Sequence, residues 1–431
     1  MTTNVISDSN LNSTPSGERI HIAFFGLRNA GKSSLVNAVT GQDLSVVSEI
    51  KGTTTDPVKK AMELLPLGAV VIIDTPGLDD EGTLGELRIK RAMNVLSNCD
   101  IAVLVHDSNL EISQAEKDLI KIFDERKLPY IIANNKIDIN SHLSVNKLTS
   151  PLQRVDSLSV SGEVPQRGGG VINVSAVTGE NIYELKEKIA SLVKNKKSEK
   201  KLISDLLDPG DVVILVVPVD KAAPKGRLIL PQQQTIRDIL DSHCSAFVCQ
   251  DTELEKILNL ITPKIVVTDS QVFGKVNKIV PKNILLTSFS ILFARYKGNL
   301  KILVEGAEKL SKLKDSDKVL ISEGCTHHRQ CGDIGTEKIP EWIKNFTNST
   351  PKFEFTSGGE FPDVERLKEF SLIIHCGGCM LNEQEMQSRI NRAKTSGVPI
   401  VNYGIAIANM HGILKRSLEP FIINEEGGSF L

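Results

Sequence analysis

The chain is 431 residues long, too long for one hydrophobic core of ordinary size, and this length predicts about three domains. Its 51 Lys and Arg residues nearly balance 53 Asp and Glu residues, and aromatic residues make up only 4%. This composition indicates no basic surface for nucleic acid or an anionic membrane and no base-stacking surface. We therefore expect neither a nucleic-acid partner nor a membrane partner.

Residues 1–17 are polar and rich in Ser, Asn and Thr. They contain no basic segment followed by an apolar one and no stretch long enough to cross a bilayer. We expect a disordered tail on a cytoplasmic protein. The seven cysteines are an odd number, which favours reduced thiols or a metal site over a disulfide framework.

Short apolar runs alternate with Gly-rich turns and helical stretches from Ile20 onward. This alternation predicts an α/β domain with a mostly parallel sheet flanked by helices, and a run of charged residues over 194–201 ends it. We place this first domain at residues 18–196. Its strands are predicted over residues 22–25, 70–73, 101–106, 130–134 and 171–174.

Two further α/β units follow, each predicted to contain a mostly parallel sheet flanked by helices. The middle unit, residues 208–285, contains no phosphate loop and no nucleophile beside a base, so we expect a structural or oligomerising role for it and no catalysis. The last unit covers residues 286–431. Its predicted helices cover residues 287–296 and 303–313, and its predicted strands cover residues 319–322, 353–356, 372–375 and 399–402.

Residues 26–33 match the phosphate-loop pattern G-x-x-x-x-G-K-[ST] between a predicted strand and a predicted helix. Backbone N–H groups of such a loop bind the β-phosphate, while Lys32 neutralises phosphate charge and Ser33 binds Mg²⁺. The loop alone indicates only a nucleoside triphosphatase of the P-loop class.

Four more motifs follow in the order expected of a GTPase. Residues 52–56 offer a Thr for Mg²⁺, Asp74 and Gly77 form D-x-x-G, and Asn135, Lys136 and Asp138 form N-K-x-D. The Asp138 carboxylate can accept both the N1–H and the exocyclic amine of guanine, and Ser175 and Ala176 complete the base pocket. We expect catalytic roles for Lys32, Thr54, Asp74 and Gly77. The residues expected to contact GTP are Gly26, Asn29, Ala30, Gly31, Lys32, Ser33, Ser34, Thr54, Asp74, Gly77, Asn135, Lys136, Asp138, Ser175 and Ala176.

On these motifs the first domain resembles the GTPases of the Era and TrmE group. Leu78 stands where many GTPases have a Gln that positions water, so another group must do so, and Asp79, Asp80 and Glu81 are candidates. The resemblance implies that Asn29 helps to hold a K⁺ ion. It therefore predicts hydrolysis of GTP that is stimulated by K⁺.

A second site is indicated by Cys325 and His327 together with His375, Cys376 and Cys379. The two groups follow predicted strands, and the carboxyl ends of parallel strands open onto one crevice. Three Cys with a weak fourth ligand can hold a [4Fe–4S] cluster, Cys and His can hold zinc, and a C-x-x-C can also be a reduced pair on a turn.

The order of a GTPase domain, a middle unit, C-x-H and a distant H-C-x-x-C resembles the GTPase family of [FeFe]-hydrogenase maturation, HydF. The resemblance implies a homodimer that binds a [4Fe–4S] cluster through Cys325, Cys376 and Cys379. His327 and His375 would be ligands or lie in the shell around them. His328, Cys331, Asp333 or an exogenous group are the candidates for the fourth ligand.

This resemblance also implies a scaffold that receives a di-iron precursor from the radical-SAM maturases HydE and HydG and delivers it to the apo-hydrogenase HydA. The alternative function is a ribosome- or RNA-associated GTPase with a structural zinc domain. A redox enzyme is disfavoured because no flavin or nicotinamide fingerprint accompanies the cysteines.

Overall fold

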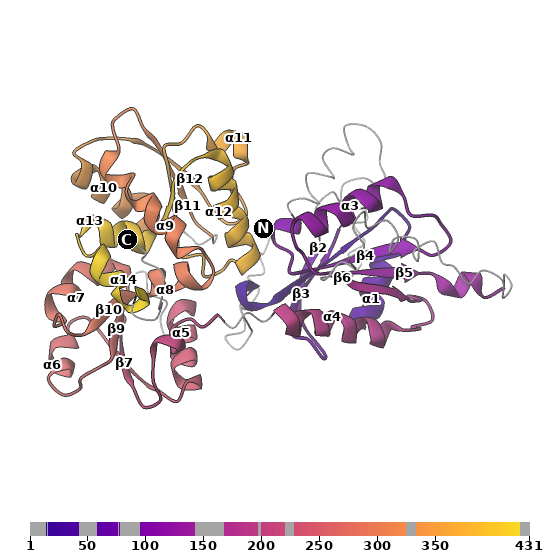
Figure 1. Ribbon diagram of the computed structural model, residues 1–431, viewed down its shortest axis with the longest axis horizontal. Coiled ribbons are helices and arrows are strands. Elements are labelled where there is room, and N and C mark those ends of the chain that lie inside the picture. Colours follow the sequence, from indigo (N-terminus) through magenta and orange to yellow (C-terminus); the bar gives the residue numbers. More distant parts are fainter. Residues whose placement is uncertain are drawn as a thin grey trace, which may run out of the picture. The chain divides into compact units, whose positions relative to one another are not determined.

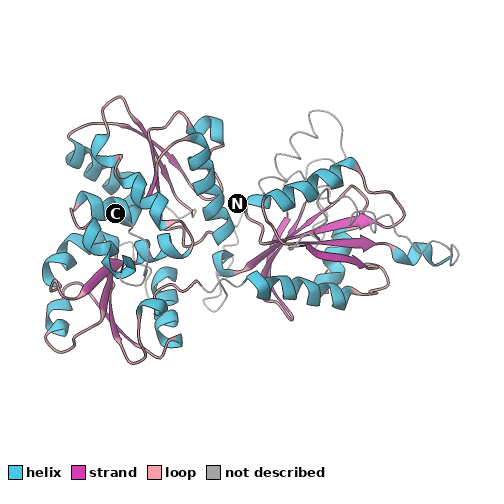
Figure 2. Ribbon diagram, viewed as in Figure 1, coloured by secondary structure: helices cyan, strands magenta, loops and turns pink. Residues whose placement is uncertain are grey.

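The computed structural model describes residues 14, 16–42, 58–75, 77, 95–142, 168–196, 200–219, 228–324 and 333–422. The chain forms two compact units, Met1–Ser198 and Glu199–Leu431 (Figures 1 and 2). None of the helices in these described ranges has the length and apolar character needed to cross a membrane.

The first unit is built on a six-stranded sheet with the order β2-β3-β1-β4-β5-β6. Its strands are β1 (Ile20–Phe25), β2 (Val58–Leu64), β3 (Gly68–Asp74), β4 (Ile101–Asp107), β5 (Tyr130–Asn135) and β6 (Gly168–Asn173). All neighbouring strands are parallel except β2, which runs antiparallel to β3. The predicted parallel sheet is confirmed. The edge strand β2 was not predicted, because most of its side chains are exposed and it shows no apolar run.

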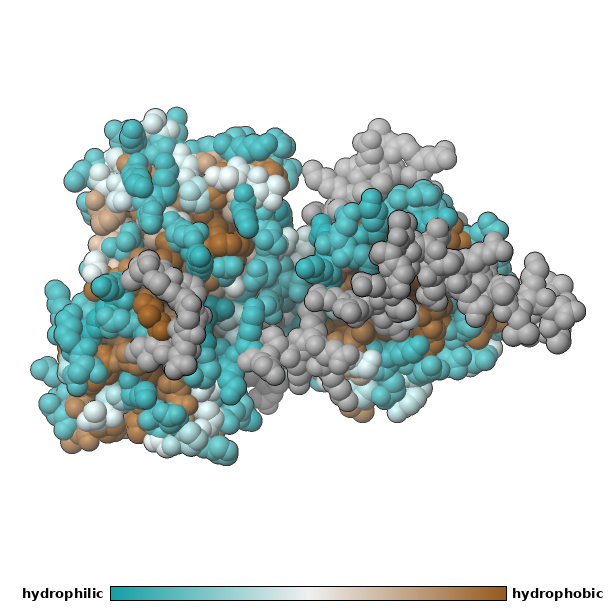
Figure 3. All heavy atoms as spheres, in the orientation of Figure 1, coloured by the Kyte–Doolittle hydropathy of each residue, from teal (hydrophilic) through white to brown (hydrophobic). Residues whose placement is uncertain are grey.

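Helices cover both faces of this sheet. Successive side chains of a strand point to opposite faces, so a strand whose side chains are all buried needs a covering layer on each face. They are α1 (Lys32–Thr40), α3 (Gln114–Glu125) and α4 (Ile182–Lys196). Phe24 faces one layer with Leu35 of α1 and Leu185 of α4, whereas Phe25 faces the other layer with Phe123 of α3. The outer face of α3 is hydrophilic and appears teal in Figure 3. The two helix layers hold the carboxyl ends of the strands in a defined arrangement.

The second unit contains two four-stranded sheets, and all strands in both are parallel. The order of one is β10 (Leu285–Ser288), β9 (Ile265–Thr268), β7 (Val212–Val216) and β8 (Ser245–Cys249). The order of the other is β12 (Lys352–Thr356), β11 (Lys318–Ser322), β13 (Leu372–His375) and β14 (Ile400–Asn402). The α/β class predicted for the chain is therefore confirmed, with three sheets for three domains.

One continuous hydrophobic core joins the two sheets of the second unit. Its helices are α5 (Leu230–Asp241), α6 (Leu254–Leu258), α7 (Phe273–Ile279), α8 (Phe289–Tyr296), α9 (Leu300–Ala307), α10 (Ile339–Thr347), α11 (Val364–Leu367), α12 (Glu383–Ser396), α13 (Tyr403–Met410) and α14 (Leu414–Ile422). The last helix, α14, packs beside β10 in the sheet formed by β7 to β10, and α9 packs beside β14 in the sheet formed by β11 to β14. A late segment of the chain thus completes the core around the sheet of β7 to β10.

Two helix predictions in this unit need correction at their ends. The helix predicted over residues 287–296 begins only at Phe289, because residues 285–288 form β10 and the Ser288 hydroxyl caps α8 by accepting from the Ile291 N–H at 3.3 Å. The helix predicted over 303–313 is α9, which ends at Ala307, followed by a separate 3₁₀ turn, Leu310–Lys312.

Strand register brings the carboxyl ends of β11, β13 and β14 level with one another. Ser322 pairs with His375, and His375 pairs with Asn402. The residues that follow these three strands therefore meet at one edge of the sheet, and Cys376 is one of them.

Candidate functional site

The phosphate loop connects β1 to α1 and needs glycine at two positions. Gly26 has φ 150°, and a Cβ there would lie 2.2 Å from the Val105 carbonyl oxygen. Gly31 has φ 86°, and a Cβ there would lie 2.4 Å from Nδ2 of Asn135. Any side chain would push the loop away from β4 and β5, so the position of the loop against these strands depends on both glycines.

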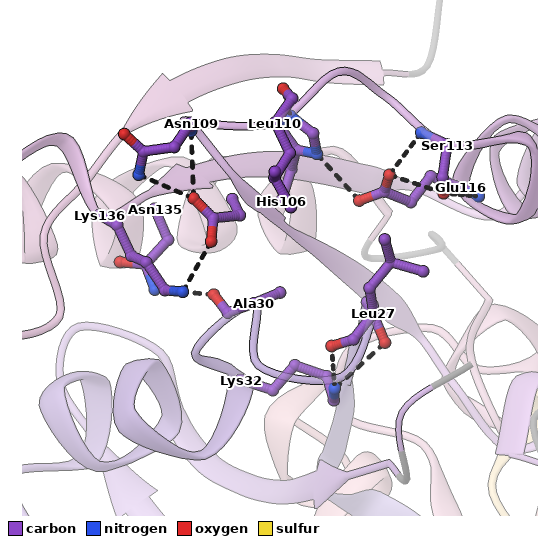
Figure 4. Close-up of polar contacts among 12 residues, drawn as sticks. Leu27, Ala30, Lys32, His106, Asn109, Leu110, Ser113, Glu116, Asn135 and Lys136 are labelled. Carbon is purple, nitrogen blue, oxygen red and sulfur yellow. Dashed lines mark hydrogen bonds and ion pairs between the residues drawn. The ribbon is translucent and has the colours of Figure 1, made fainter. Parts of the chain in front are cut away.

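Lys32 is buried at the start of α1, and its ammonium is directed back over the loop (Figure 4). Its Nζ donates hydrogen bonds to the carbonyl oxygens of Gly26 at 3.1 Å and Leu27 at 2.7 Å. The loop thereby places a cation at its own centre, where β- and γ-phosphate groups would lie.

Ser33 and Asp74 come together from the ends of α1 and β3. The Ser33 hydroxyl donates to Oδ2 of Asp74 at 2.7 Å, and the buried Oδ1 has no hydrogen-bond partner among the described residues. Burial raises the pKa of Asp74, while the Ser33 hydrogen bond and the Lys32 charge act to lower it. A hydroxyl and a carboxylate with a spare oxygen are ligands that Mg²⁺ prefers, so this pair fits the predicted metal ion.

Gly77 of the D-x-x-G motif lies against the phosphate loop. A Cβ at this position would lie 2.9 Å from the backbone nitrogen of Arg28. The structure therefore brings together the loop and Gly77, as a γ-phosphate contact requires. Thr54 and the rest of residues 52–56, Leu78, and the water-positioning candidates Asp79, Asp80 and Glu81 lie outside the described residues.

Asn29 lies at the exposed tip of the phosphate loop in the left-handed region, with φ 62°. Asn tolerates this conformation better than most residues because its short amide can bond locally. Ala30 is buried behind it, and Ser34 is exposed on the first turn of α1.

Asn135, at the end of β5, links residues that are predicted to form the base pocket. Its Nδ2 donates to the Ala30 carbonyl oxygen at 3.0 Å, and its Oδ1 accepts from the Ala176 N–H at 3.0 Å. The Ser175 hydroxyl donates to Oδ1 of Asp138 at 2.6 Å. These contacts hold the phosphate loop and both base-recognition motifs in one arrangement.

Asp107 was missed by the sequence analysis. Lys136, at φ 67°, donates from Nζ to Oδ2 of Asp107 at 2.6 Å (Figure 4). Burial acts to raise the pKa of Asp107, but hydrogen bonds from Lys136 and Asn109 outweigh it and lower the pKa. The sequence did place Asp107 directly after a predicted strand, where site residues are expected. No sequence motif, however, indicates that Asp107 pairs with Lys136.

Beside this ion pair lies a buried pair formed by His106 and Glu116. Nδ1 of His106 lies 2.9 Å from Oε1 of Glu116, and Nε2 lies 3.2 Å from the Leu110 carbonyl oxygen (Figure 4). Both ring nitrogens thus face acceptors, the arrangement that favours the imidazolium. Burial acts to lower the pKa of His106, but the Glu116 hydrogen bond and charge prevail and raise it. Glu116 also accepts from the backbone and hydroxyl of Ser113 and so caps α3.

In the second unit, Cys376 and Cys379 lie on the turn that follows β13. The Cys376 sulfur accepts hydrogen bonds from the backbone N–H of Gly324 at 3.0 Å and of Gly378 at 3.4 Å. Gly378 has φ 64°, which closes the turn. Burial raises the pKa of Cys376 to about 11 and also raises that of Cys379. Two thiols with N–H···S contacts are a donor set that fits iron or zinc.

His375 is fully buried beneath this turn, and both of its ring nitrogens are occupied. Nε2 lies 3.0 Å from Nη1 of Arg389, which can only donate, and Nδ1 therefore carries the proton that is donated to the Cys376 carbonyl at 2.7 Å. Burial and the charge of Arg389 lower the pKa of His375 to about 3. Arg389 in turn donates to Glu385 at 2.8 Å. In this arrangement His375 orients Cys376, and neither nitrogen has a lone pair directed at a metal.

Of the other residues predicted as cluster ligands, the structure describes only Asp333. Its Oδ2 accepts from the Thr336 N–H and hydroxyl, both at 2.8 Å, at the start of a π-helical turn. Cys325, His327, His328 and Cys331 lie outside the described residues. Within the described ranges, no three His, Cys, Asp or Glu side chains form a group that could hold a metal ion.

Lys297 is a second residue that the sequence analysis missed. It follows α8, is only 3% exposed, and donates from Nζ to the carbonyl oxygens of Cys379 at 3.1 Å and Leu381 at 2.9 Å. Its charge acts to lower the pKa of Cys379 against the larger effect of burial. No periodicity or motif marks such a residue, because the contact joins segments about eighty residues apart in the chain.

The chain is similar to known GTPases over somewhat less than half of its length. It is 31% identical over 210 residues to GTPase Der from Mycoplasmopsis pulmonis, covering 47% of each chain. It is 33% identical over 192 residues to the tRNA modification GTPase MnmE from Psychrobacter arcticus, covering 43% of this chain and 38% of the relative. The chain thus spans about half or less of the length of these curated relatives.

Solved structures also resemble parts of the chain. Era from Aquifex aeolicus shares 18% identity, covers 54% of this chain and 94% of its own, and has a TM-score of 0.34. The G domain of the FeoB iron transporter from T. maritima shares 26% identity, covers 41% of this chain and 99% of its own, and has a TM-score of 0.30.

Three family models match consecutive parts of the chain. Residues 21–136 match the model described as 50S ribosome-binding GTPase, so the first domain is a P-loop GTPase domain. Residues 202–298 match the hydrogen maturase F dimerization domain, and residues 301–420 match the hydrogen maturase F tetramerization domain. With both of these domains following a GTPase domain, the chain belongs to the hydrogen maturase F family.

Proposed function

We propose that the protein is a GTP-hydrolysing scaffold that binds a [4Fe–4S] cluster and carries the di-iron precursor of the [FeFe]-hydrogenase active site to the apo-hydrogenase. The observation that carries this proposal is the presence, in one chain, of a GTPase domain and two hydrogen maturase F domains. Its partners would be HydE and HydG as donors and HydA as acceptor.

GTP hydrolysis is assigned to the phosphate loop and its neighbours. Water attacks the γ-phosphorus, the bond to the β-phosphate oxygen breaks, and GDP and phosphate are released. Lys32, which lies over the loop, would neutralise the phosphate charge, and Ser33 with Asp74 would hold Mg²⁺. Asn29 is proposed to help hold K⁺, which would supply the positive charge that other GTPases obtain from an arginine finger.

The cluster is assigned to Cys325, Cys376 and Cys379. Support comes from the single turn that carries the last two thiols and from the two backbone N–H groups directed at the Cys376 sulfur. When bound, the cluster would supply an iron site at which cargo can be exchanged. His375 and Arg389 would orient the turn, and the fourth ligand is open among His328, Cys331, Asp333 and an exogenous group.

Anaerobic reconstitution with iron and sulfide, followed by EPR spectroscopy of the reduced protein, tests the cluster. Wild type should show a reducible iron signal, Cys376→Ser should lose it, and the buried Cys244→Ser should keep it as a control. Lys32→Ala should abolish GTP turnover and leave the iron signal intact. Stoichiometric zinc without a reducible iron signal would overturn the assignment.

Self-association is proposed to use the outer edge of β8. No described strand pairs with this edge, and Phe247 and Val248 are 39% and 41% exposed on it. An unpaired edge strand is a template for pairing with a second copy. Val248→Lys should shift the protein toward monomer in light scattering coupled to size exclusion, whereas Leu260→Lys, at a site 83% exposed, should not.

A second candidate is a ribosome-associated GTPase, because the model that matches residues 21–136 is described as ribosome-binding. The near balance of 51 basic and 53 acidic residues provides no broad cationic surface for it. GTP-dependent co-sedimentation with 50S subunits at physiological salt would favour this candidate.

A further inference from the structure

We propose that Lys297 is the residue that holds the C-x-x-C turn in place and biases the cluster toward its reduced state through its buried charge. This inference rests on the proposed [4Fe–4S] cluster. It names Lys297, which lies outside the C-x-H and H-C-x-x-C motifs, as a residue that sets the cluster's reduction potential.

Burial of Lys297 is the first observation. Lysine is rarely buried, because removing an ammonium from water is costly unless other groups compensate. Lys297 is only 3% exposed, and its Nζ lies 5.6 Å from the centroid of the Phe293 ring on α8. A cation over an aromatic face is stabilised by the ring quadrupole. The site is therefore built to keep this charge inside the protein.

The second observation is where the ammonium is directed. It donates to the carbonyl oxygens of Cys379 and Leu381, at 3.1 and 2.9 Å, and so bridges the second cysteine of the motif and the residue two positions later. Hydrogen bonds from a charged donor are stronger than neutral ones. Lys297 thus fixes the backbone that presents the Cys379 sulfur.

The backbone of Lys297 is held by hydrogen bonds from another helix. Nε2 of Gln387, on α12, donates to the carbonyl oxygens of Lys297 at 3.1 Å and Gly298 at 2.9 Å. At Gly298 a Cβ would lie 2.6 Å from the Ala294 carbonyl oxygen, so the chain leaves α8 without room for a side chain. The ammonium therefore projects from a backbone that is held on both sides.

The other end of α8 also touches the cysteine turn. A Cβ on Gly377 would lie 3.6 Å from the Ser290 hydroxyl, and that hydroxyl accepts from the Gly404 N–H at 3.1 Å. Ser290 and Lys297 fall within residues 202–298, which match the dimerization model, whereas the cysteines fall within residues 301–420. One short helix from the dimerization segment thus forms a wall of the proposed cluster site.

The buried charge of Lys297 affects the reduction potential of the proposed cluster. Each one-electron reduction adds a negative charge to the cluster, and reduction potentials of iron–sulfur clusters depend on nearby charge and hydrogen bonding. A buried cation that is hydrogen-bonded to the Cys379 carbonyl oxygen is screened little by solvent. It therefore stabilises the reduced state relative to the oxidised state.

The test is an EPR-monitored redox titration of the reconstituted full-length protein with Lys297→Met, Lys297→Arg and, as a control, Lys344→Met on the exposed face of α10. At the wild-type midpoint potential, the ratio of reduced to oxidised cluster should fall about tenfold in Lys297→Met, a shift of about 59 mV for a one-electron couple. Lys297→Arg and Lys344→Met should stay within about twofold of wild type.

A Lys297→Met cluster with the wild-type ratio would overturn the proposal. If Lys297→Met assembles no cluster, Lys297→Gln is titrated in its place. Loss of the cluster in both neutral variants but not in Lys297→Arg supports a need for the cation, and its loss in all three overturns the proposal. Absence of iron in wild type would instead remove the proposed function itself, so the two failures are distinguishable.

Discussion

The Ser33 hydroxyl donates to the Asp74 carboxylate at 2.7 Å, and it joins the start of α1 to the end of β3. The two residues are 41 positions apart in the chain, yet they present adjacent oxygens with one buried carboxylate oxygen left without a described partner. This relationship is the structural basis of the Mg²⁺ assignment.

Ser33→Ala should therefore lower the rate of GTP hydrolysis by roughly 10²–10³-fold, the usual cost of removing one preorganised group that stabilises the transition state. The reason is loss of a metal ligand. Phosphate release at saturating Mg²⁺ measures it, with the exposed Ser191→Ala on α4 as a matched control. An unchanged rate would remove Ser33 from the metal site.

Asp138→Asn should change the preference of the base pocket. The carboxylate accepts two guanine donors, whereas an amide offers one donor and one acceptor. The one lost hydrogen bond to a charged group costs about 1.5–3 kcal/mol, so GTP affinity should fall by roughly 10–10²-fold. Xanthosine triphosphate, which has a carbonyl in place of the amine, should gain affinity. Equal losses for both nucleotides would argue that Asp138 only supports Ser175.

Rates of GTP hydrolysis should be higher in K⁺ than in Na⁺ at equal ionic strength, and Asn29→Ala should remove this difference. Asn29 is exposed at the tip of the phosphate loop, so its removal leaves the core intact. Asn259→Ala, at an exposed position in the second unit, is the control. Equal wild-type rates in the two salts would end the K⁺ proposal.

Stability of the first unit should depend on pH through His106 and Glu116. The pKa of His106 is raised above 6.5, so its contribution is complete below about pH 6.5 and is lost as pH rises through the folded-state value. The pKa of Glu116 is lowered below 4.5, so its contribution is lost as pH falls through that lower value. Both charges are therefore present between these limits.

Urea unfolding followed by Phe and Tyr fluorescence at pH 6 and pH 9 measures the effect. Wild type should be less stable at pH 9 than at pH 6, because the contribution of the His106 imidazolium is lost as pH rises through its raised pKa. Glu116→Gln should flatten the dependence by removing the cause of the raised pKa. A wild-type profile that stays level over this interval would contradict the ion pair.

Local patterns were enough to predict which residues follow the strands of the first sheet. Lys32, Ser33, Asp74, Asn135 and Asp138 lie at or just after the carboxyl ends of β1, β3 and β5, and the carboxyl ends of parallel strands meet at one edge of a sheet. Asp107 was missed, since its role depends on the distance to Lys136 across two strands. Likewise, the last two residues of β10 were predicted as helix, because a strand of four residues is too short to show a clear period.

For the cysteine site, the sequence by itself determined which residue types are available and that two of the thiols share a turn, because a C-x-x-C spacing is a local property. Only the tertiary structure decided how His375 is used. Its two nitrogens are engaged by Arg389 and by the Cys376 carbonyl, and the first contact comes from another element of the fold. It also decided that Lys297 lies beside Cys379, because burial and charge compensation arise from segments that meet in space and leave no spacing in the chain.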